Sequence, residues 1–229
     1  MKAMKARWVA VSETSLMLYL GEELDVEQAP LIGKLAAYIM SNYAEVCEVT
    51  PSYTSILIQV GTPHVDLEDL AVRILQTTES GVISNSSRGK LIKLPVYYHS
   101  DVAPDLVAVA RSSGLSIEEL INIHTGRDYT VCAIGFAPGF AFLADVDPRI
   151  ALARHAEPRA HVAAGSVGIA GGQTAVYPAD SPGGWQLIGR CPTPLYCPDQ
   201  QPASPFEVGD KVRFISIELE EYLERGGHV

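Results

Sequence analysis

Long hydrophobic runs are absent from this sequence of 229 residues. A membrane-spanning helix needs roughly 20 consecutive apolar residues, and no apolar run in this chain approaches that length. The basic start, Met1–Ala10, resembles that of an export signal, but the apolar run that follows, Leu16–Leu20, is shorter than the roughly 7–15 residues of a signal core. The sequence therefore predicts a cytoplasmic protein without membrane contact.

Cysteine pairs are also absent. The four cysteines, Cys47, Cys132, Cys191 and Cys197, form no C-x-x-C pair, and the six histidines form no H-E-x-x-H motif. Cys191 and Cys197 alone lack the second ligand pair that a zinc site needs. We therefore expect free thiols, as in a reducing compartment, and no bound metal.

Basic side chains are few, since 17 Lys and Arg face 27 Asp and Glu, for a net charge of −10. The segment Asp105–Leu120 resembles a helix-turn-helix. Its second helix, however, offers Glu118 and Glu119 and carries no Lys or Arg from Ser116 to Thr125, whereas a DNA-reading helix needs donors for bases and phosphates. These features argue against nucleic-acid binding and favour a packed helix pair.

Hydrophobic periodicity predicts an N-terminal α/β domain over residues 1–97. The expected order is strand, helix, two strands, helix, strand, which is typical of a split βαβ sandwich and of the α+β class. The expected helices are Glu27–Asn42 and Leu67–Thr78, and the expected strands are Trp8–Val11, Ser15–Leu20, Glu45–Thr50, Ser55–Val60 and Lys90–Tyr98.

A second domain is expected over residues 98–229. It opens with a pair of short helices, Asp105–Ser112 and Ile117–His124, and then becomes rich in Gly and Pro. Many short strands separated by such turns predict a β-barrel or sandwich. The expected strands are Tyr129–Ile134, Gly168–Ala170, Gln173–Tyr177, Gln186–Gly189 and Lys211–Ile217, and Arg225–Val229 is expected to be a loose tail.

Several polar side chains lie among the glycines of this second domain. Arg190 follows the apolar run Leu187–Gly189, so its guanidinium is expected at a strand end, where it can bind a carboxylate or phosphate. The alternative is a structural ion pair with Asp180 or Asp145. Gln173 and Thr174 can bind an amide or a carboxylate, or can cap a turn.

Aromatic side chains in the same block are candidates for an apolar wall. Trp185 follows two glycines and can line a pocket or belong to the core. Phe136, Phe140 and Phe142 can line a groove or an interface, or pack in the core. No P-loop, dinucleotide fingerprint or nucleophile elbow accompanies them. His124 and His161 are conceivable bases, although a lone histidine is more often structural.

Three motifs in order carry a family resemblance: Gly135–Phe140, Ala164–Thr174 and Ser181–Arg190. They resemble the carboxyltransferase domain, subdomain A and B, family, also called allophanate hydrolase subunit 1, which includes the B subunit of 5-oxoprolinase and the kinase inhibitor KipI. The likeness covers most of the chain. It implies an N-terminal α/β domain and a C-terminal cyclophilin-like β-barrel.

The resemblance also implies a role as one component of an ATP-dependent 5-oxoprolinase, inactive alone. The implied partners are a C subunit of the allophanate hydrolase subunit 2 type and an A subunit of the LamB/YcsF type, with ATP bound at a site that a partner completes. Alternatives are a KipI-like inhibitor of a sensor histidine kinase and a component of a urea or allophanate system.

Opening a lactam at the expense of ATP needs cationic and hydrogen-bonding groups aimed at developing charge. For an enzyme of this family we therefore expect Arg159 and Arg190 to hold carboxylate or phosphoryl oxygens as catalytic residues. Substrate binding is expected at five further positions, namely Gln173, Thr174, Tyr177, Trp185 and Phe140.

Overall fold

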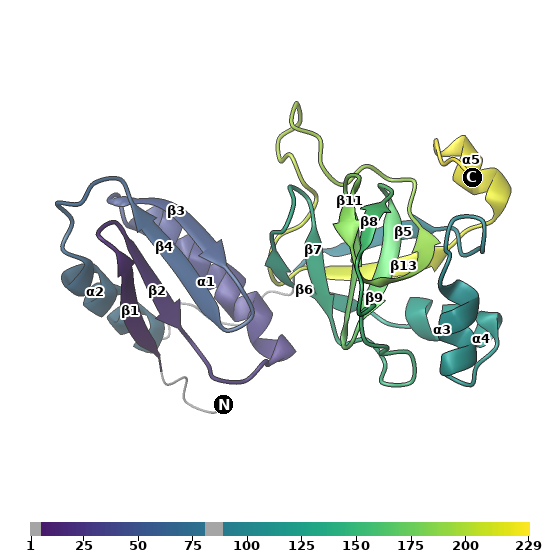
Figure 1. Cartoon of the computed structure of the whole chain (residues 1–229). Coiled ribbons are helices and arrows are strands. Elements are labelled where there is room, and N and C mark those ends of the chain that lie inside the picture. Colours follow the sequence, from purple (N-terminus) through teal and green to yellow (C-terminus); the bar gives the residue numbers. More distant parts are fainter. Residues whose placement is uncertain (1–5, 81–88) are drawn as a thin grey trace. The chain divides into compact units, whose positions relative to one another are not determined.

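The chain, seen here as a computed structural model, divides into two compact units (Figure 1). The structure describes residues 6–80 and 89–229. The first unit comprises Met1–Gly89 with Glu207–Gly209, and the second comprises Lys90–Phe206 with Asp210–Val229. Most of the basic start of the chain, residues 1–5, lies outside the described residues. Within those residues, no helix is long and apolar enough to cross a membrane.

The first unit is an antiparallel sheet in the order β1-β2-β4-β3 with helices on one face. Leu16 and Leu18 of β2 pair with Ile58 and Ile56 of β4, so the alternation of each strand places these four side chains on one face. They pack against buried residues of α1 and α2. The elements are β1 (Arg7–Ser12), β2 (Ser15–Tyr19), η1 (Val26–Gln28), α1 (Ala29–Asn42), β3 (Val46–Pro51), β4 (Ser55–Val60) and α2 (Leu67–Glu79).

The strand expected to close this N-terminal sheet belongs instead to the second unit. This strand, β5 (Leu91–Val96), pairs in parallel with β13 (Lys211–Ser216) over six residue pairs. The N-terminal α/β sheet and the α+β class are confirmed, but β5 is not part of that sheet, and the boundary between the units falls before β5 rather than at residue 97. Periodicity identifies a strand but does not identify its partner, which here lies 120 residues later.

The second unit is built on a seven-stranded sheet in the order β12-β9-β10-β7-β6-β13-β5. All neighbours are antiparallel except β13 and β5. The expected barrel is thus confirmed as a barrel-like sheet. Its remaining strands are β6 (Tyr129–Ile134), β7 (Ala141–Ala144), β9 (Ser166–Ala170), β10 (Gln173–Val176) and β12 (Gln186–Arg190).

A single bridge joins the two edges of this sheet. Tyr97, just beyond β5, exchanges two backbone hydrogen bonds of 2.9 Å with Arg190 at the end of β12. Gly189 lies at this seam, and a Cβ there would come within 2.6 Å of Val96 Cγ1 and 3.0 Å of Tyr98 Cδ1. Glycine is therefore required for the two edges to approach.

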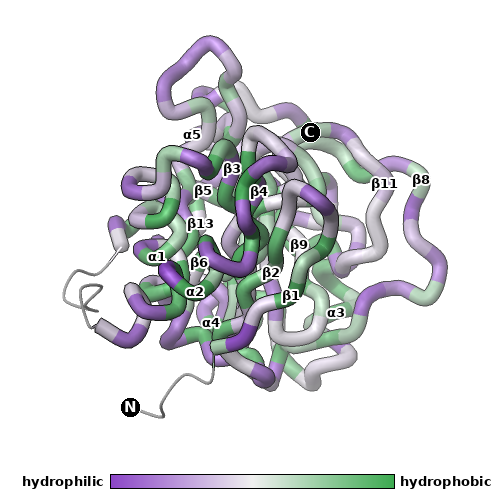
Figure 2. The backbone as a smooth tube through the Cα atoms, turned by 90° about the vertical axis from the view of Figure 1, so that its left-hand side faces the viewer, coloured by the Kyte–Doolittle hydropathy of each residue, from purple (hydrophilic) through white to green (hydrophobic). Residues whose placement is uncertain are grey.

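Smaller elements surround the barrel. Two strands that were not predicted, β8 (Arg159–Val162) and β11 (Ser181–Gly183), form a separate ribbon. The ribbon packs over the barrel, because Val162 shares a buried cluster with Phe140, Tyr177 and Leu187. Figure 2 shows hydrophobic stretches within the strands and hydrophilic ones in many turns. The helices are α3 (Leu106–Ser112), α4 (Ile117–Thr125) and α5 (Leu219–Glu224). A capping box between Ser116 and Glu119 begins α4.

Candidate functional site

An aromatic pocket opens between the ribbon and the barrel. Its volume is about 360 Å³, which falls in the roughly 300–1,000 Å³ range of small-molecule sites. Phe140 and Phe142 enter from β7 and the turn before it, Tyr177 follows β10, and Trp185 lies between β11 and β12. The remaining lining residues are Phe136, Arg154, Pro158, Pro182, Gly183 and Gly184. Three of the expected binding residues, Phe140, Tyr177 and Trp185, therefore meet here.

The walls of this pocket are held by packing between rings. Phe140 lies edge-on to Phe142, Tyr177 and Trp185, with ring centroids 4.8, 5.4 and 5.7 Å apart. Such edge-to-face pairs stabilise a fixed arrangement. Gly183 lies against the ring of Tyr177, since a Cβ there would come within 2.4 Å of the phenol oxygen. At the rim, Phe136 is 64% exposed and has a φ of 74°.

Two arginines lie beside the aromatic pocket, and they differ in what they contact. Arg159 donates to Asp105 Oδ1 at 2.6 Å and to the carbonyl of Trp185 at 3.4 Å. Arg154 lines the pocket, is exposed, and makes no hydrogen bond or ion pair to any described residue. The cation available to a ligand here is therefore Arg154, which the sequence did not single out, while Arg159 is held by the fold.

Asp105 is the buried anchor of this region. Its Oδ2 accepts from the backbone N–H of Leu187 at 2.7 Å, and its own N–H donates to the carbonyl of Leu187 at 3.1 Å. Its side chain is 8% exposed, against 29% for that of Arg159. Asp105 thereby ties the start of α3 to β12 and to the first residue of β8, next to Trp185.

Arg190 lies at a second hollow, of about 290 Å³. Tyr177 lines both this hollow and the aromatic pocket. Among the described residues, no direct ion pair joins Arg190 to Asp180 or Asp145: Asp180 pairs with His161 at 3.0 Å and Asp145 with Arg127 at 3.9 Å. Arg190 nevertheless lies close enough to Asp180 for its charge to help lower the pKa of that carboxyl, after the hydrogen bonds from Ala164 and His161.

Gln173 and Thr174 do not line either hollow. Thr174 is fully buried in the barrel, where a chain of hydrogen bonds uses its hydroxyl. Thr174 donates to the carbonyl of Gly168 at 2.9 Å, accepts from His124 Nε2 at 3.0 Å, and His124 Nδ1 accepts from the Tyr98 hydroxyl at 2.7 Å. This donor order requires a neutral His124 protonated on Nε2. Thr174 and His124 therefore belong to the core. His161 pairs with Asp180 at an exposed position and lines neither hollow.

Burial of His124 makes the stability of the second unit depend on pH. Burial lowers the pKa of His124 from 6.5 to about 3. As pH falls, His124 therefore binds a proton in the unfolded chain before it does so in the folded one. The free energy of unfolding is at its full value above pH 6.5 and decreases below it, by at most about 1.4 kcal/mol per pH unit. Chemical denaturation from pH 7 to 5 is expected to show this slope, and His124→Gln to reduce it. Equal slopes for the parent and for His124→Gln would contradict the assignment of this pH dependence to His124.

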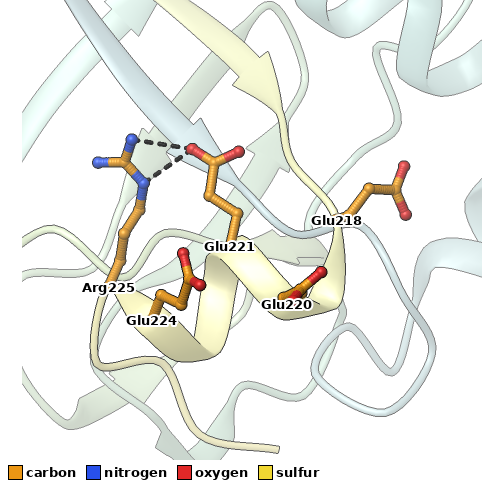
Figure 3. Close-up of a pocket in the computed structure, with 5 residues that line it drawn as sticks. All are labelled: Glu218, Glu220, Glu221, Glu224 and Arg225. Atoms are coloured by element: carbon orange, nitrogen blue, oxygen red, sulfur yellow. Dashed lines mark hydrogen bonds and ion pairs between the residues drawn. The ribbon is translucent and has the colours of Figure 1, made fainter.

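A third hollow, beside α5, is acidic (Figure 3). It is lined by Glu218, Glu220, Glu221, Glu224 and Arg225, and Arg225 bonds to Glu221 one turn away at 2.8 Å. This is a solvated helix face.

Within residues 6–80 and 89–229, no three His, Cys, Asp or Glu side chains gather in a way that would hold a metal ion. The four cysteines are free thiols.

Comparison with protein families gives one match over most of the chain. A model described as the carboxyltransferase domain, subdomain C and D, matches residues 6–206. The motifs had indicated this carboxyltransferase-domain family, but with the subdomains named A and B. The match thus confirms the family resemblance and corrects the subdomain letters to C and D.

Relatives and solved structures agree with this match. The chain is 35% identical to the B subunit of 5-oxoprolinase from Bacillus subtilis over 227 residues, which is 93% of each chain. It is 35% identical to the B subunit of 5-oxoprolinase from Escherichia coli O157:H7 over 212 residues, 92% of this chain and 96% of the relative. The crystal structure of TTHA0988 superposes with a TM-score of 0.79 at 31% identity, over 89% of this chain and 40% of that chain. The urea amidolyase of Kluyveromyces lactis, at 20% identity, over 96% of this chain and 15% of that chain, and a TM-score of 0.73, shares the fold.

Proposed function

The chain belongs to the carboxyltransferase domain, subdomain C and D, family, and from this we propose that it acts as the B subunit of an ATP-dependent 5-oxoprolinase. Such a complex converts 5-oxo-L-proline to L-glutamate with ATP hydrolysis. The observation that carries the proposal is the extent of the match, because relatives of that name align over 93% or more of their own lengths. We place this activity in the cytoplasm, where ATP is available.

The aromatic pocket fits the substrate of this reaction. A five-membered lactam is a small, flat ring with one carboxylate, and the pocket offers several aromatic side chains with Arg154 among its lining residues. Binding sites of this kind combine apolar walls with few polar groups that fix orientation. We assign the ring to the pocket that Phe140, Tyr177 and Trp185 line together, and the carboxylate to Arg154.

We propose that this chain supplies only part of the catalytic site. A lactam is a poor electrophile, and coupling to ATP activates its amide oxygen toward water. That step needs several cations or backbone N–H groups around phosphoryl oxygens, and the sequence contains no phosphate-binding loop. We therefore propose that the C and A subunits complete the ATP site, and that this chain binds the lactam and excludes water from it.

Two other functions were open from the sequence. Phe136 at the pocket rim, 64% exposed, is suited to contact with another protein. That contact fits docking on a partner of the enzyme complex as well as on a sensor histidine kinase, whereas the names of the full-length relatives favour the enzyme. The likeness to a urea amidolyase is at the level of fold.

Reconstitution tests the proposal directly. This chain is co-purified with its candidate A and C subunits, and ADP release is measured with 5-oxo-L-proline, with urea, and with neither. We expect hydrolysis that depends on 5-oxo-L-proline and on all three chains. Stimulation by urea alone would assign the chain to the urea system. An inactive complex, together with inhibition of a sensor kinase by this chain, would support the inhibitor function.

A further inference from the structure

The hollow at Arg190 is built from two parts of the chain that are distant in sequence. One side comes from the segment around Gly165 and from residues 190–194, and the other from Tyr222 and residues 226–228. At about 290 Å³ it has room for a small molecule. Of the described residues, only Tyr177 lines both this hollow and the aromatic pocket.

The C-terminal wall of this hollow is ordered, so the expectation of a loose tail at Arg225–Val229 is wrong. The Tyr222 hydroxyl donates to the carbonyl of His228 at 3.0 Å. Gly227 lies on the Tyr222 ring, because a Cβ there would come within 2.4 Å of it, and Gly226 takes a φ of 86° to turn the chain. Close packing on a buried tyrosine therefore fixes the tail as one wall.

Arg190 lines this hollow, and one of its donors lacks an acceptor in the described part of the chain. Its backbone is used by the bridge to Tyr97, which fixes where the side chain begins. Its Nε is buried and has no hydrogen-bond partner among the described residues. The nearby carboxylate of Asp180 is already engaged, by the N–H of Ala164 at 2.8 Å and by His161 at 3.0 Å. A buried guanidinium donor that lacks an acceptor is costly unless a ligand supplies one.

The charges lining the hollow point to the class of ligand. In a chain of net charge −10, its described lining includes Arg190 and His228 but no Asp or Glu. A guanidinium presents a planar fork of donors that matches the oxygens of a carboxylate or a phosphate. We propose that the Arg190 hollow is a binding site for a small oxyanion, distinct from the aromatic pocket. This site stands independently of the 5-oxoprolinase assignment.

Binding to the full chain, without partners or turnover, tests this site. Backbone amide NMR shifts of Gly165, Gly226 and Gly227 are followed during titration with inorganic phosphate, with L-glutamate, or with chloride at matched ionic strength. We expect saturable shifts with phosphate or glutamate and not with chloride. The anion of the two that binds with the higher affinity shows whether the site takes a phosphate or a carboxylate. Saturable shifts confined to the aromatic pocket, or none, would overturn the proposal.

Variants separate binding from folding. Arg190→Gln is expected to weaken binding of the anion at least tenfold. Arg190→Lys keeps the charge but loses the planar fork of donors, so it should weaken binding less. Arg111→Gln, at an exposed position of α3, is the matched control and should bind the anion as the parent does. Unchanged affinity in both Arg190 variants would refute the site. If Arg190→Gln lowers the melting temperature, Arg190→Lys decides the outcome.

Discussion

Replacing Asp105 with alanine is expected to lower the free energy of unfolding by about 3 kcal/mol, because removing one partner of a buried ion pair leaves the other charge without compensation. The Asp105 side chain is 8% exposed and holds both Arg159 and the N–H of Leu187. Its loss leaves a buried backbone donor unpaired as well. The value lies at the lower end of the usual range because Arg159 retains 29% exposure.

Urea denaturation of the two proteins measures this change. Asp101→Ala is the matched control, since Asp101 is 62% exposed and pairs with a half-exposed His99; its effect should stay within about 0.5 kcal/mol. Arg159→Met, alone and combined with Asp105→Ala, completes a double-mutant cycle. A loss below about 1 kcal/mol for Asp105→Ala would show that the pair does not anchor β8 and β12.

Replacing Arg154 with glutamine is expected to reduce kcat/KM for 5-oxo-L-proline roughly 10- to 100-fold in the reconstituted complex. A hydrogen bond to a charged group contributes about 1.5–3 kcal/mol, and the Arg154 guanidinium at the aromatic pocket is placed to make one. The loss should fall mainly on KM, because the substrate carboxylate is bound in the ground state and in the transition state alike.

Controls for this prediction lie in the same unit. Arg154→Lys should recover part of the activity, and Arg111→Gln, an exposed arginine outside both hollows, should leave it unchanged. Arg159→Gln is informative because its expected effect is on stability first. If Arg154→Gln keeps the full kcat/KM and Arg159→Gln loses activity while remaining as stable as the parent, then Arg159 and not Arg154 binds the substrate carboxylate.

Much of the secondary structure follows from periodicity; the errors concern the pairing of β5 and four short elements that were not predicted, β7, β8, β11 and α5. The helices α1 to α4 and the strands of the first unit lie where the hydrophobic spacing predicts them. The partner of β5 was missed because Leu94 and Val96 can be buried against any sheet. The ribbon strands β8 and β11 are only four and three residues long, which is too short for a hydrophobic alternation to mark them.

The same physics explains which site residues were found. Phe140 and Trp185 are large apolar groups that each follow a glycine, a pattern that indicates a wall, and Tyr177 lies in the same glycine-rich block. Thr174 was expected in the binding site but lies in the core. Strand alternation explains this, because Ala175 and Tyr177 pack in the cluster beneath the ribbon and Thr174 therefore faces the opposite side of the strand. Arg154 lies in a loop without a motif, and only the fold brings it to the aromatic pocket.

The parallel pairing of β5 with β13 has a consequence during synthesis on the ribosome. Translation proceeds at roughly 5–20 residues per second, so the 120 residues that separate Lys90 from its contact at Asp210 take on the order of ten seconds to appear. The β1–β4 strands of the first unit emerge long before. Nascent chains stalled ahead of Lys211 should therefore expose β5 to proteases and chaperones, while the N-terminal sheet is already protected.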